Sequence, residues 1–287
     1  MSLLLVSCPS SVEEKPSSLV IASWNVQNLF NATDEGTEYD EFKSSSGWEE
    51  KQYRVRLSKV EAVLGYGELS KASVIVLCEV ENEAVVEDIL SLSSLKKRGF
   101  EYYACAGEEG GAIKTAVISC YPIEEAFIHA FSGIRPVLEV RIRVGDKRLS
   151  LLAVHAKSNL GEEEENRRLR ERAGRIIESL YYSNESDYFV VAGDFNEEVS
   201  SGCVILHPYL WYNFWEDVLN ELNCGGSYRY DGTWLKYDNI VCSGGALSGG
   251  VECSGILSTI YGYPDAFSRN MLSGVSDHFP VWLRLTQ

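Results

Sequence analysis

The chain has 287 residues, of which 45% are hydrophobic and 24% charged, an ordinary composition for a globular protein. Its formal net charge is −16, from 26 basic and 42 acidic side chains, which argues against non-specific binding of a polyanion through a basic surface. The eight cysteines include no CxxC pair, so the spacing of a zinc finger is absent. An enzyme acting on phosphates remains compatible with this charge, because clustered carboxylates can hold a divalent cation that reverses the local sign.

The first 18 residues predict a tether that precedes a single domain over residues 19–287. Leu5-Val6-Ser7-Cys8 resembles a bacterial lipobox, in which the cysteine is lipidated after cleavage. The basic region and the long apolar core of a complete signal peptide are missing, so the alternative is a frayed N-terminus with a chance cysteine. The expected location is extracytoplasmic, with anchoring to the membrane through lipidated Cys8, and otherwise cytoplasmic.

Apolar runs of strand length and helical patterns follow one another along the chain, which is typical of an α/β protein. The run 137–144 alternates apolar and polar residues, as a half-buried antiparallel strand does, and Gly145-Asp146 follows it as a hairpin turn. The predicted helices are 48–64, 82–92 and 162–180, and the predicted strands are 19–23, 73–78, 102–106, 115–120, 126–131, 137–144, 149–155, 188–192, 227–236, 237–243 and 279–285.

The segment from Tyr188 to Asn196 is the centre of the functional pattern. Its apolar run predicts a buried strand, and Gly193 allows a sharp turn where the strand ends. Asp194 and Asn196 lie two residues apart, so in an extended segment both side chains point the same way. They can hold a water, a cation or a phosphate oxygen, and the structural alternative is an Asx turn that closes the strand.

Polar side chains of this kind recur at the ends of other predicted strands, where ligands and catalytic groups gather in open α/β sheets. The carboxylate and amide oxygens among them are hard ligands suited to Mg²⁺, Mn²⁺ or Ca²⁺ and poorly suited to zinc. The histidines can transfer protons or donate to a phosphate near neutral pH. The residues are Asn25, Glu79, His155, Asp194, Asn196, Asp238, Asp277 and His278.

These residues stand in six segments: Trp24-Asn25-Val26-Gln27-Asn28, Glu79, His155, Gly193-Asp194-Phe195-Asn196, Tyr237-Asp238-Asn239-Ile240 and Ser276-Asp277-His278-Phe279-Pro280-Val281. The set resembles the endonuclease/exonuclease/phosphatase superfamily, in particular its deoxyribonuclease-like members and the bacterial extracellular nuclease-like branch. The resemblance runs in the family's order from Val20 to Leu285. It implies an α/β fold, a four-layer sandwich of two mixed, mainly antiparallel β-sheets flanked by helices.

The resemblance also implies a metal site that serves phosphoester hydrolysis. By position, Glu79 is similar to the family's principal metal ligand, with Asn25 beside it. Asp277 would complete the site as a ligand or as a neighbour of the ligands. The expected cofactor is Mg²⁺, with Mn²⁺ or Ca²⁺ as alternatives.

The same resemblance assigns catalytic roles to five further residues. Asp194 would orient or deprotonate the attacking water, and Asn196 would hold that water or a phosphate oxygen. His278, oriented by Asp238, would bind the scissile phosphate. His155 would stabilise the pentacoordinate state or help to protonate the leaving oxygen. In this mechanism the metal neutralises charge on the phosphate oxygens and the water attacks in line.

Three residues are expected to bind the substrate. Lys157 and Asn159 resemble a segment of extracellular nuclease-like members in which a lysine reaches phosphate, and Arg135 stands where deoxyribonuclease-type members contact the DNA backbone. The alternative for the two cations is a weak surface ion pair. One position departs from the family, because Lys114 occupies the place of a glutamate that pairs with the first histidine, here His155.

Three functions follow, in order of preference. The first is a Mg²⁺-dependent phosphodiesterase, most of all a deoxyribonuclease-like nuclease, with nucleic acid as its phosphoester substrate. The second is a phosphatase or sphingomyelinase-type phosphodiesterase acting on a small or lipid phosphoester, which the acidic surface favours. The third is a surface lipoprotein that binds a partner without catalysis. The sequence itself indicates no protein partner.

Overall fold

The computed structural model describes residues 18–199, 205–206, 211–213, 215, 225–243, 251–256 and 266–286, with the backbone alone for 211–213, 251–256 and 286. Residues 1–17 of the predicted tether, with Cys8, lie outside this range, so the tether and its lipidation stay predictions. None of the helices in the described part of the chain is long and apolar enough to cross a membrane.

Two six-stranded sheets and one small hairpin make up the β-structure. In the first sheet the spatial order is β13 (Val251–Ile256), β14 (Val281–Thr286), β1 (Ser18–Leu29), β2 (Val74–Val80), β4 (Lys114–Ser119), β3 (Tyr102–Gly107). In the second it is β5 (Ile123–Phe131), β6 (Ile134–Val144), β7 (Lys147–His155), β8 (Tyr188–Asp194), β12 (Asp238–Ser243), β9 (Trp211–Asn213). Each sheet has one parallel pair, β1 with β2 and β7 with β8, and the other pairs are antiparallel.

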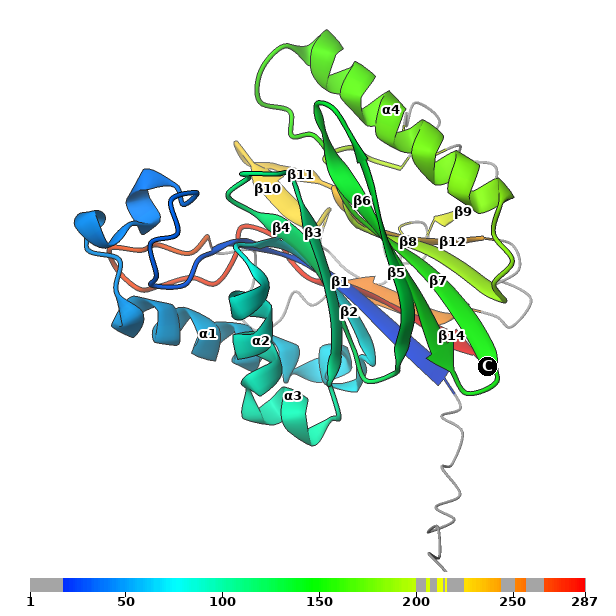
Figure 1. The fold of residues 1–287 in the computed structure, drawn as a ribbon, viewed down its shortest axis with the longest axis horizontal. Helices are drawn as coiled ribbons and strands as arrows, with labels where there is room; N and C mark the ends of the chain where they lie inside the picture. The colour runs from blue at the N-terminus through cyan, green and yellow to red at the C-terminus, as the bar shows by residue number, and fades with distance from the viewer. Residues whose placement is uncertain are drawn as a thin grey trace, which may run out of the picture.

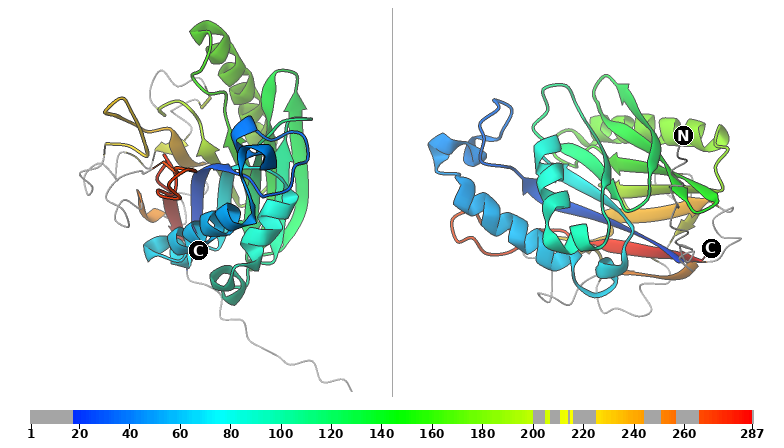
Figure 2. Two further views of the ribbon diagram at one scale, coloured as in Figure 1. Left: turned by 90° about the vertical axis from the view of Figure 1, so that its left-hand side faces the viewer. Right: turned by 60° about the horizontal axis from the view of Figure 1, so that its bottom comes forward.

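The helices lie on the outer faces of the paired sheets. Those covering the first sheet are α1 (Glu50–Leu64), α2 (Glu83–Ser91) and α3 (Ser93–Lys97), and α4 (Glu163–Tyr182) covers the second (Figure 1). Figure 2 shows the same layering from two other sides. Short 3-10 helices, η1 (Asp40–Phe42), η2 (Ser44–Ser46) and η3 (Gly67–Lys71), flank α1. The expected four-layer sandwich of two mixed sheets is therefore confirmed.

Three hydrophobic cores lie between the four layers. Each central strand contributes side chains to two of these cores, one on each face of its sheet. In β1, Leu19 and Ile21 pack between the sheets, whereas Val20 and Ala22 pack under the helices. On the other sheet, the apolar residues of β8 divide in the same way between the central core and the core under α4. Because successive side chains of a strand point to opposite faces, a strand buried on both faces must be apolar throughout. This is why the runs in the sequence predicted the strands.

Several elements differ from the expectation, and β9, β13 and α3 were not predicted at all. The single strand predicted at 227–236 is a hairpin of β10 (Tyr228–Tyr230) and β11 (Thr233–Leu235). Its turn is Asp231-Gly232, where both residues have positive φ, 45° and 79°, as a two-residue hairpin turn requires. β1 is also longer than predicted, because it continues through the polar segment up to Leu29.

Candidate active site

Most of the predicted site residues converge on one cavity of about 400 Å³ where strand ends of the two sheets meet. Three of the predicted residues come from neighbouring strands in register, because His155 of β7 lies beside Asp194 of β8, which lies beside Asp238 of β12. The predicted residues that line the cavity are Glu79, Arg135, His155, Asn159, Asp194, Asn196, Asp277 and His278. Asn25, Lys157 and Asp238 stand outside the lining.

A β-bulge places Glu79. Cys78 and Val80 pair with the consecutive residues Thr115 and Lys114 of β4, so Glu79 is an extra residue in β2, and its φ is +67°. Positive φ is uncommon for a residue with a side chain, and such strain gathers at functional sites. One Glu79 oxygen, Oε2, accepts a hydrogen bond from the backbone N–H of Asn28 at 2.9 Å. Burial raises the pKa of Glu79, and the nearby charge of Asp277 raises it further.

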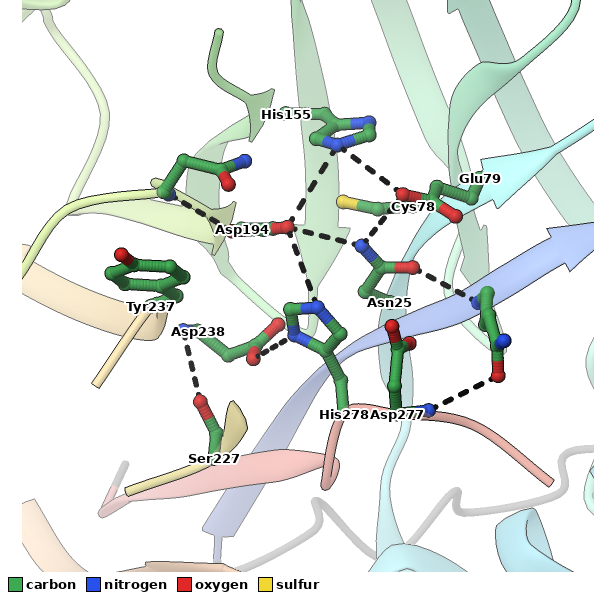
Figure 3. Close-up of polar contacts among 12 residues, drawn as sticks. Asn25, Cys78, Glu79, His155, Asp194, Ser227, Tyr237, Asp238, Asp277 and His278 are labelled. Atoms are coloured by element: carbon green, nitrogen blue, oxygen red, sulfur yellow. Dashed lines mark hydrogen bonds and ion pairs between the residues drawn. The ribbon is translucent and has the colours of Figure 1, made fainter. Parts of the chain in front are cut away.

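Asn25 connects the two sheets at the centre of the site (Figure 3). Its Nδ2 donates to Glu79 Oε1 at 3.1 Å and to Asp194 Oδ2 at 3.0 Å. Its Oδ1 accepts from the backbone N–H of Gln27 at 2.9 Å. In this arrangement Asn25 positions both carboxylates through its amide nitrogen, while the oxygen expected to bind metal is engaged by the backbone. Metal ligation by Asn25 stays a prediction.

β8 ends at Gly193 and Asp194, and Gly193 has a backbone conformation that few other residues could adopt. Gly193 has a φ of +148°, and a Cβ there would overlap the carbonyl oxygen of Val154 on the adjacent parallel strand. Asp194 is 2% exposed, and its Oδ1 accepts from the backbone N–H of Asn196 at 2.9 Å, the Asx turn that was the structural alternative. Burial raises the pKa of Asp194 to about 7, against the lowering effect of the His278 charge.

His155 faces both carboxylates. Its Nε2 lies 3.7 Å from Glu79 Oε1 and 3.8 Å from Asp194 Oδ2. Burial, together with the charges of Arg135 and His278, holds the pKa of His155 well below its usual value, so the ring is neutral. Lys114, the residue at the family's glutamate position, stands at the start of β4. The carboxylates nearest to His155 are thus Glu79 and Asp194.

His278 is paired with a buried aspartate. Its Nδ1 lies 2.6 Å from Asp238 Oδ2, and its Nε2 points to Asp194 Oδ2 at 4.0 Å (Figure 3). Burial opposes a charge on the ring, but the charge of Asp238 and the hydrogen bond to it prevail and raise the pKa of His278 to about 10. The ring of Tyr228 stacks on the imidazole, with centroids 4.5 Å apart and planes 24° apart. The pair therefore presents a charged imidazolium with its Nε2–H toward the cavity.

Two residues to which the sequence patterns assigned no role position the segments carrying these groups. Gln27 Oε1 accepts from the backbone N–H groups of Phe267, at 2.7 Å, and of Asp277, at 3.2 Å. Arg56 is fully buried on α1 and donates to backbone carbonyls of Val26, Gln27 and Val275. The available signal was the position of Arg56 itself, since a charge on the apolar face of a predicted helix calls for a buried partner.

The predicted substrate-binding residues differ in their placement. Arg135 lines the cavity, and its Nη1 donates to the carbonyl of Ala156 at 3.0 Å. Asn159 also lines it and donates through Nδ2 to the hydroxyl of Tyr237 at 2.8 Å. The ammonium of Lys157 instead donates to the carbonyl of Leu160 at 3.0 Å, away from the lining. A phosphate contact by Lys157 stays a prediction.

The donors around Glu79 fit a hard divalent cation in their chemistry. Glu79 and Asp277 both line the cavity and both supply oxygen, and the charge of Asp277 disfavours ionisation of Glu79. A cation between them would relieve that repulsion. Within the described residues, no group of three or more His, Cys, Asp or Glu side chains is spaced to hold a metal ion by itself, so water or substrate oxygens would have to complete the coordination.

Comparison with known proteins agrees with this geometry. A protein-family model described as the endonuclease/exonuclease/phosphatase family matches residues 20–259. No curated protein matches the chain. Solved structures do match, at low sequence identity and over nearly the whole chain.

Three of these structures show the range. A humanized TDP2 from D. rerio has a TM-score of 0.66 at 16% identity, covering 94% of this chain and 100% of its own. An endonuclease/exonuclease/phosphatase family protein from Bacteroides thetaiotaomicron has a TM-score of 0.61 at 17% identity, with coverages of 93% and 97%. An AP endonuclease from Archaeoglobus fulgidus has a TM-score of 0.60 at 14% identity, with coverages of 92% and 98%. At these identities the similarity establishes the fold.

Proposed function

Because the chain belongs to the endonuclease/exonuclease/phosphatase family, whose members are generally metal-dependent phosphoester hydrolases, we propose that it is a Mg²⁺-dependent phosphodiesterase acting on nucleic acid. The observation that carries this proposal is the convergence on one cavity of Glu79, Asp194 and His278, whose ring is held by Asp238. One solved relative in fold, D. rerio TDP2, was crystallised with a single-strand DNA product, which supports nucleic acid as the substrate class.

The residues divide the chemistry according to their protonation. Asp194, with a pKa of about 7, is suited to accept a proton from the attacking water near neutral pH. Asn196, whose side chain lines the cavity, would orient that water or a phosphate oxygen. His278 carries a charge and would donate through Nε2 to a non-bridging phosphate oxygen, with Asp238 holding the ring in place.

On the opposite side, neutral His155 would donate a hydrogen bond to the oxygen that leaves. Glu79 and Asp277 would hold a Mg²⁺ ion, and the ion supplies positive charge that offsets the charge developing on the phosphate oxygens. Arg135 and Asn159 would contact the substrate beside the scissile bond. Their contribution is orientation, because a phosphate held by several donors stays in line with the attacking water.

A second candidate is a phosphatase or phosphodiesterase acting on a small phosphoester. Arg135 is the only arginine or lysine among the described residues lining the cavity, and the net charge is −16. A polymer held along its backbone is usually contacted by several cations on each side of the scissile phosphate. The scarcity of cations at this cavity therefore favours a substrate with few phosphates.

The deciding experiment is Mg²⁺-dependent hydrolysis of plasmid DNA, single-stranded DNA, sphingomyelin and an inositol polyphosphate, each with and without EDTA. We expect cleavage of DNA that stops with EDTA. Glu79→Gln, which removes the carboxylate and keeps the shape, should lower turnover by about 10²-fold or more. Glu83→Gln is the matched control, because Glu83 is exposed at the start of α2 and outside the cavity.

The outcomes separate the candidates. Cleavage of the lipid or of the inositol phosphate alone would move the substrate and keep the chemistry. Equal turnover of Glu79→Gln and Glu83→Gln would contradict the role of Glu79. Folded, metal-bound protein without activity on any of the four substrates would favour a binding protein over an enzyme.

We further propose, as the N-terminal sequence suggests, an extracytoplasmic location with a tether over residues 1–18 and one domain over 19–287. Lipidation of Cys8 would anchor this domain to a membrane. Metabolic labelling with palmitate, compared between the full chain and Cys8→Ser, tests it. Label in both proteins, or in neither, would remove the lipid anchor from the proposal.

A further inference from the structure

The hairpin of β10 and β11 places a group of parallel aromatic rings beside the candidate active site. Tyr228 and Tyr230 lie two residues apart on β10 and so point to the same face. The Tyr228 ring stacks with His278 at 4.5 Å, with Tyr237 at 5.6 Å and an angle of 18°, and with Tyr230 at 6.5 Å and an angle of 17°. All four rings line the cavity, and Tyr228 stands at the centre of the group with the other three rings nearly parallel to it.

The hairpin is fixed to the segment that carries His278. Tyr228 forms a β-bridge with His278, and the backbone N–H of Phe279 donates to the carbonyl of Ser227 at 2.7 Å. At the base of the hairpin a Cβ on Gly226 would overlap the backbone of Leu235, so the chain is closely packed there. These backbone contacts therefore hold the hairpin beside the segment that carries His278.

Tyr230, the outermost ring, is 67% exposed. Its neighbour Arg229 lies on the other face of the strand, where its guanidinium covers the ring of Trp234 at 5.8 Å. The mouth of the cavity thus offers an aromatic face and no arginine or lysine on the side of the hairpin among its described lining residues. Proteins bind single-stranded nucleic acids with exposed aromatic rings on which the bases stack, because every base has a π-face.

We propose that Tyr230, backed by Tyr228, is a stacking subsite for an unpaired nucleobase next to the scissile phosphate. This inference rests on the proposed function and specifies its substrate as single-stranded nucleic acid or a frayed end. In a duplex the bases are already stacked and paired, so their faces cannot reach Tyr230. Base stacking would also add binding free energy that the small number of phosphate contacts does not provide.

The test measures binding and cleavage of two labelled strands of about 12 nucleotides, a length within the range that single-strand binding sites cover. One strand carries bases, and the other is the same phosphodiester with abasic residues throughout. Binding is followed by fluorescence anisotropy in EDTA and cleavage with Mg²⁺. Tyr230→Ala should weaken binding of the base-containing strand by about 5-fold to 150-fold, the equivalent of one stacked base, and should affect the abasic strand much less.

Two variants serve as controls. Tyr230→Phe keeps the ring and should keep the affinity. Tyr182→Ala removes a tyrosine that is equally exposed, 69%, at the end of α4 and outside the cavity, and should change neither strand. Equal losses on the two strands, or no loss from Tyr230→Ala, would overturn the stacking subsite. If wild-type protein cleaves neither strand, the proposed nuclease function fails, and the difference in anisotropy still decides the subsite.

Discussion

At the scale of single residues, the bond between Asp238 and His278 determines which form of the ring faces the cavity. Asp238 is fully buried, its Oδ2 lies 2.6 Å from His278 Nδ1, and its backbone N–H donates to the hydroxyl of Ser227. Within the described residues Asp238 Oδ1 has no hydrogen-bond partner. Burying a carboxylate whose second oxygen accepts no hydrogen bond costs free energy unless a nearby positive charge compensates it. Here the charge of Asp238 stabilises the imidazolium of His278.

Asp238→Asn should therefore lower kcat by about 100-fold or more, because the amide cannot stabilise the charged ring in the same orientation. Circular dichroism should show the fold unchanged. Asp187→Asn is the matched control, since Asp187 is an exposed carboxylate that pairs with Lys147 near the other end of β8. Steady-state turnover of Asp238→Asn within a few-fold of the control would remove the pair from the mechanism.

At the scale of elements, the functional groups depend on irregularities in otherwise regular strands. Glu79 stands at a bulge of β2, Gln27 and Asn28 have positive φ within β1, and Gly193 has positive φ near the end of β8. A bulge or a residue of positive φ bends the strand without ending its pairing with the neighbouring strand. A polar side chain at that point can therefore face the cavity, although the rest of the strand is apolar on both faces.

Gly193→Ala tests this dependence. The added methyl group would overlap the Val154 carbonyl, so β7 and β8 must separate where His155 and Asp194 stand side by side. We expect a loss of about 3 kcal/mol or more in the free energy of unfolding. Gly145→Ala also replaces a glycine of positive φ, +62°, but in open space, and should cost about 1 kcal/mol. Urea unfolding of both variants checks the prediction, and equal losses would contradict it.

Strands and helices were predictable from the sequence because the spacing of apolar residues in each segment reflects which of its faces is buried. The helices predicted at 48–64, 82–92 and 162–180 are α1, α2 and α4, with small shifts at their ends. The bulge at Glu79 was not predictable, since nothing local requires a glutamate to adopt positive φ. The hairpin at 228–235 had a visible signal in Asp231-Gly232, which the continuous aromatic pattern concealed.

At the scale of the whole molecule, the site is assembled from segments far apart in the sequence. The motif residues from Asn25 to His278 were recognisable, and eight of the predicted residues line the cavity. The contacts that hold them were not recognisable, because a pairing such as that of Arg56 with the Val275 carbonyl spans 219 positions and leaves no periodic trace. The residues of the candidate site were therefore easier to predict than the contacts that hold them in place.

Arg56→Met tests how much these contacts stabilise the protein. The substitution leaves the carbonyls of Val26, Gln27 and Val275 buried without their shared donor, and it removes the guanidinium that lies 4.4 Å from the Phe267 ring. We expect a loss of about 3 kcal/mol in the free energy of unfolding. Arg54→Met, on the same helix, breaks only an exposed pair with Glu50 and should cost less than about 1 kcal/mol. Thermal unfolding compares them, and equal Tm values would contradict the role of Arg56.

The pairing of β14 with β1 has a consequence for synthesis of the chain. β1 leaves the ribosome first, and its neighbour β14 is the last strand described, directly after Asp277 and His278. A nascent chain holds an open edge on β1 and no imidazolium for the cavity until translation has passed these residues. Any hydrolytic activity that depends on His278 is thereby delayed until this segment has been translated and β14 has paired with β1.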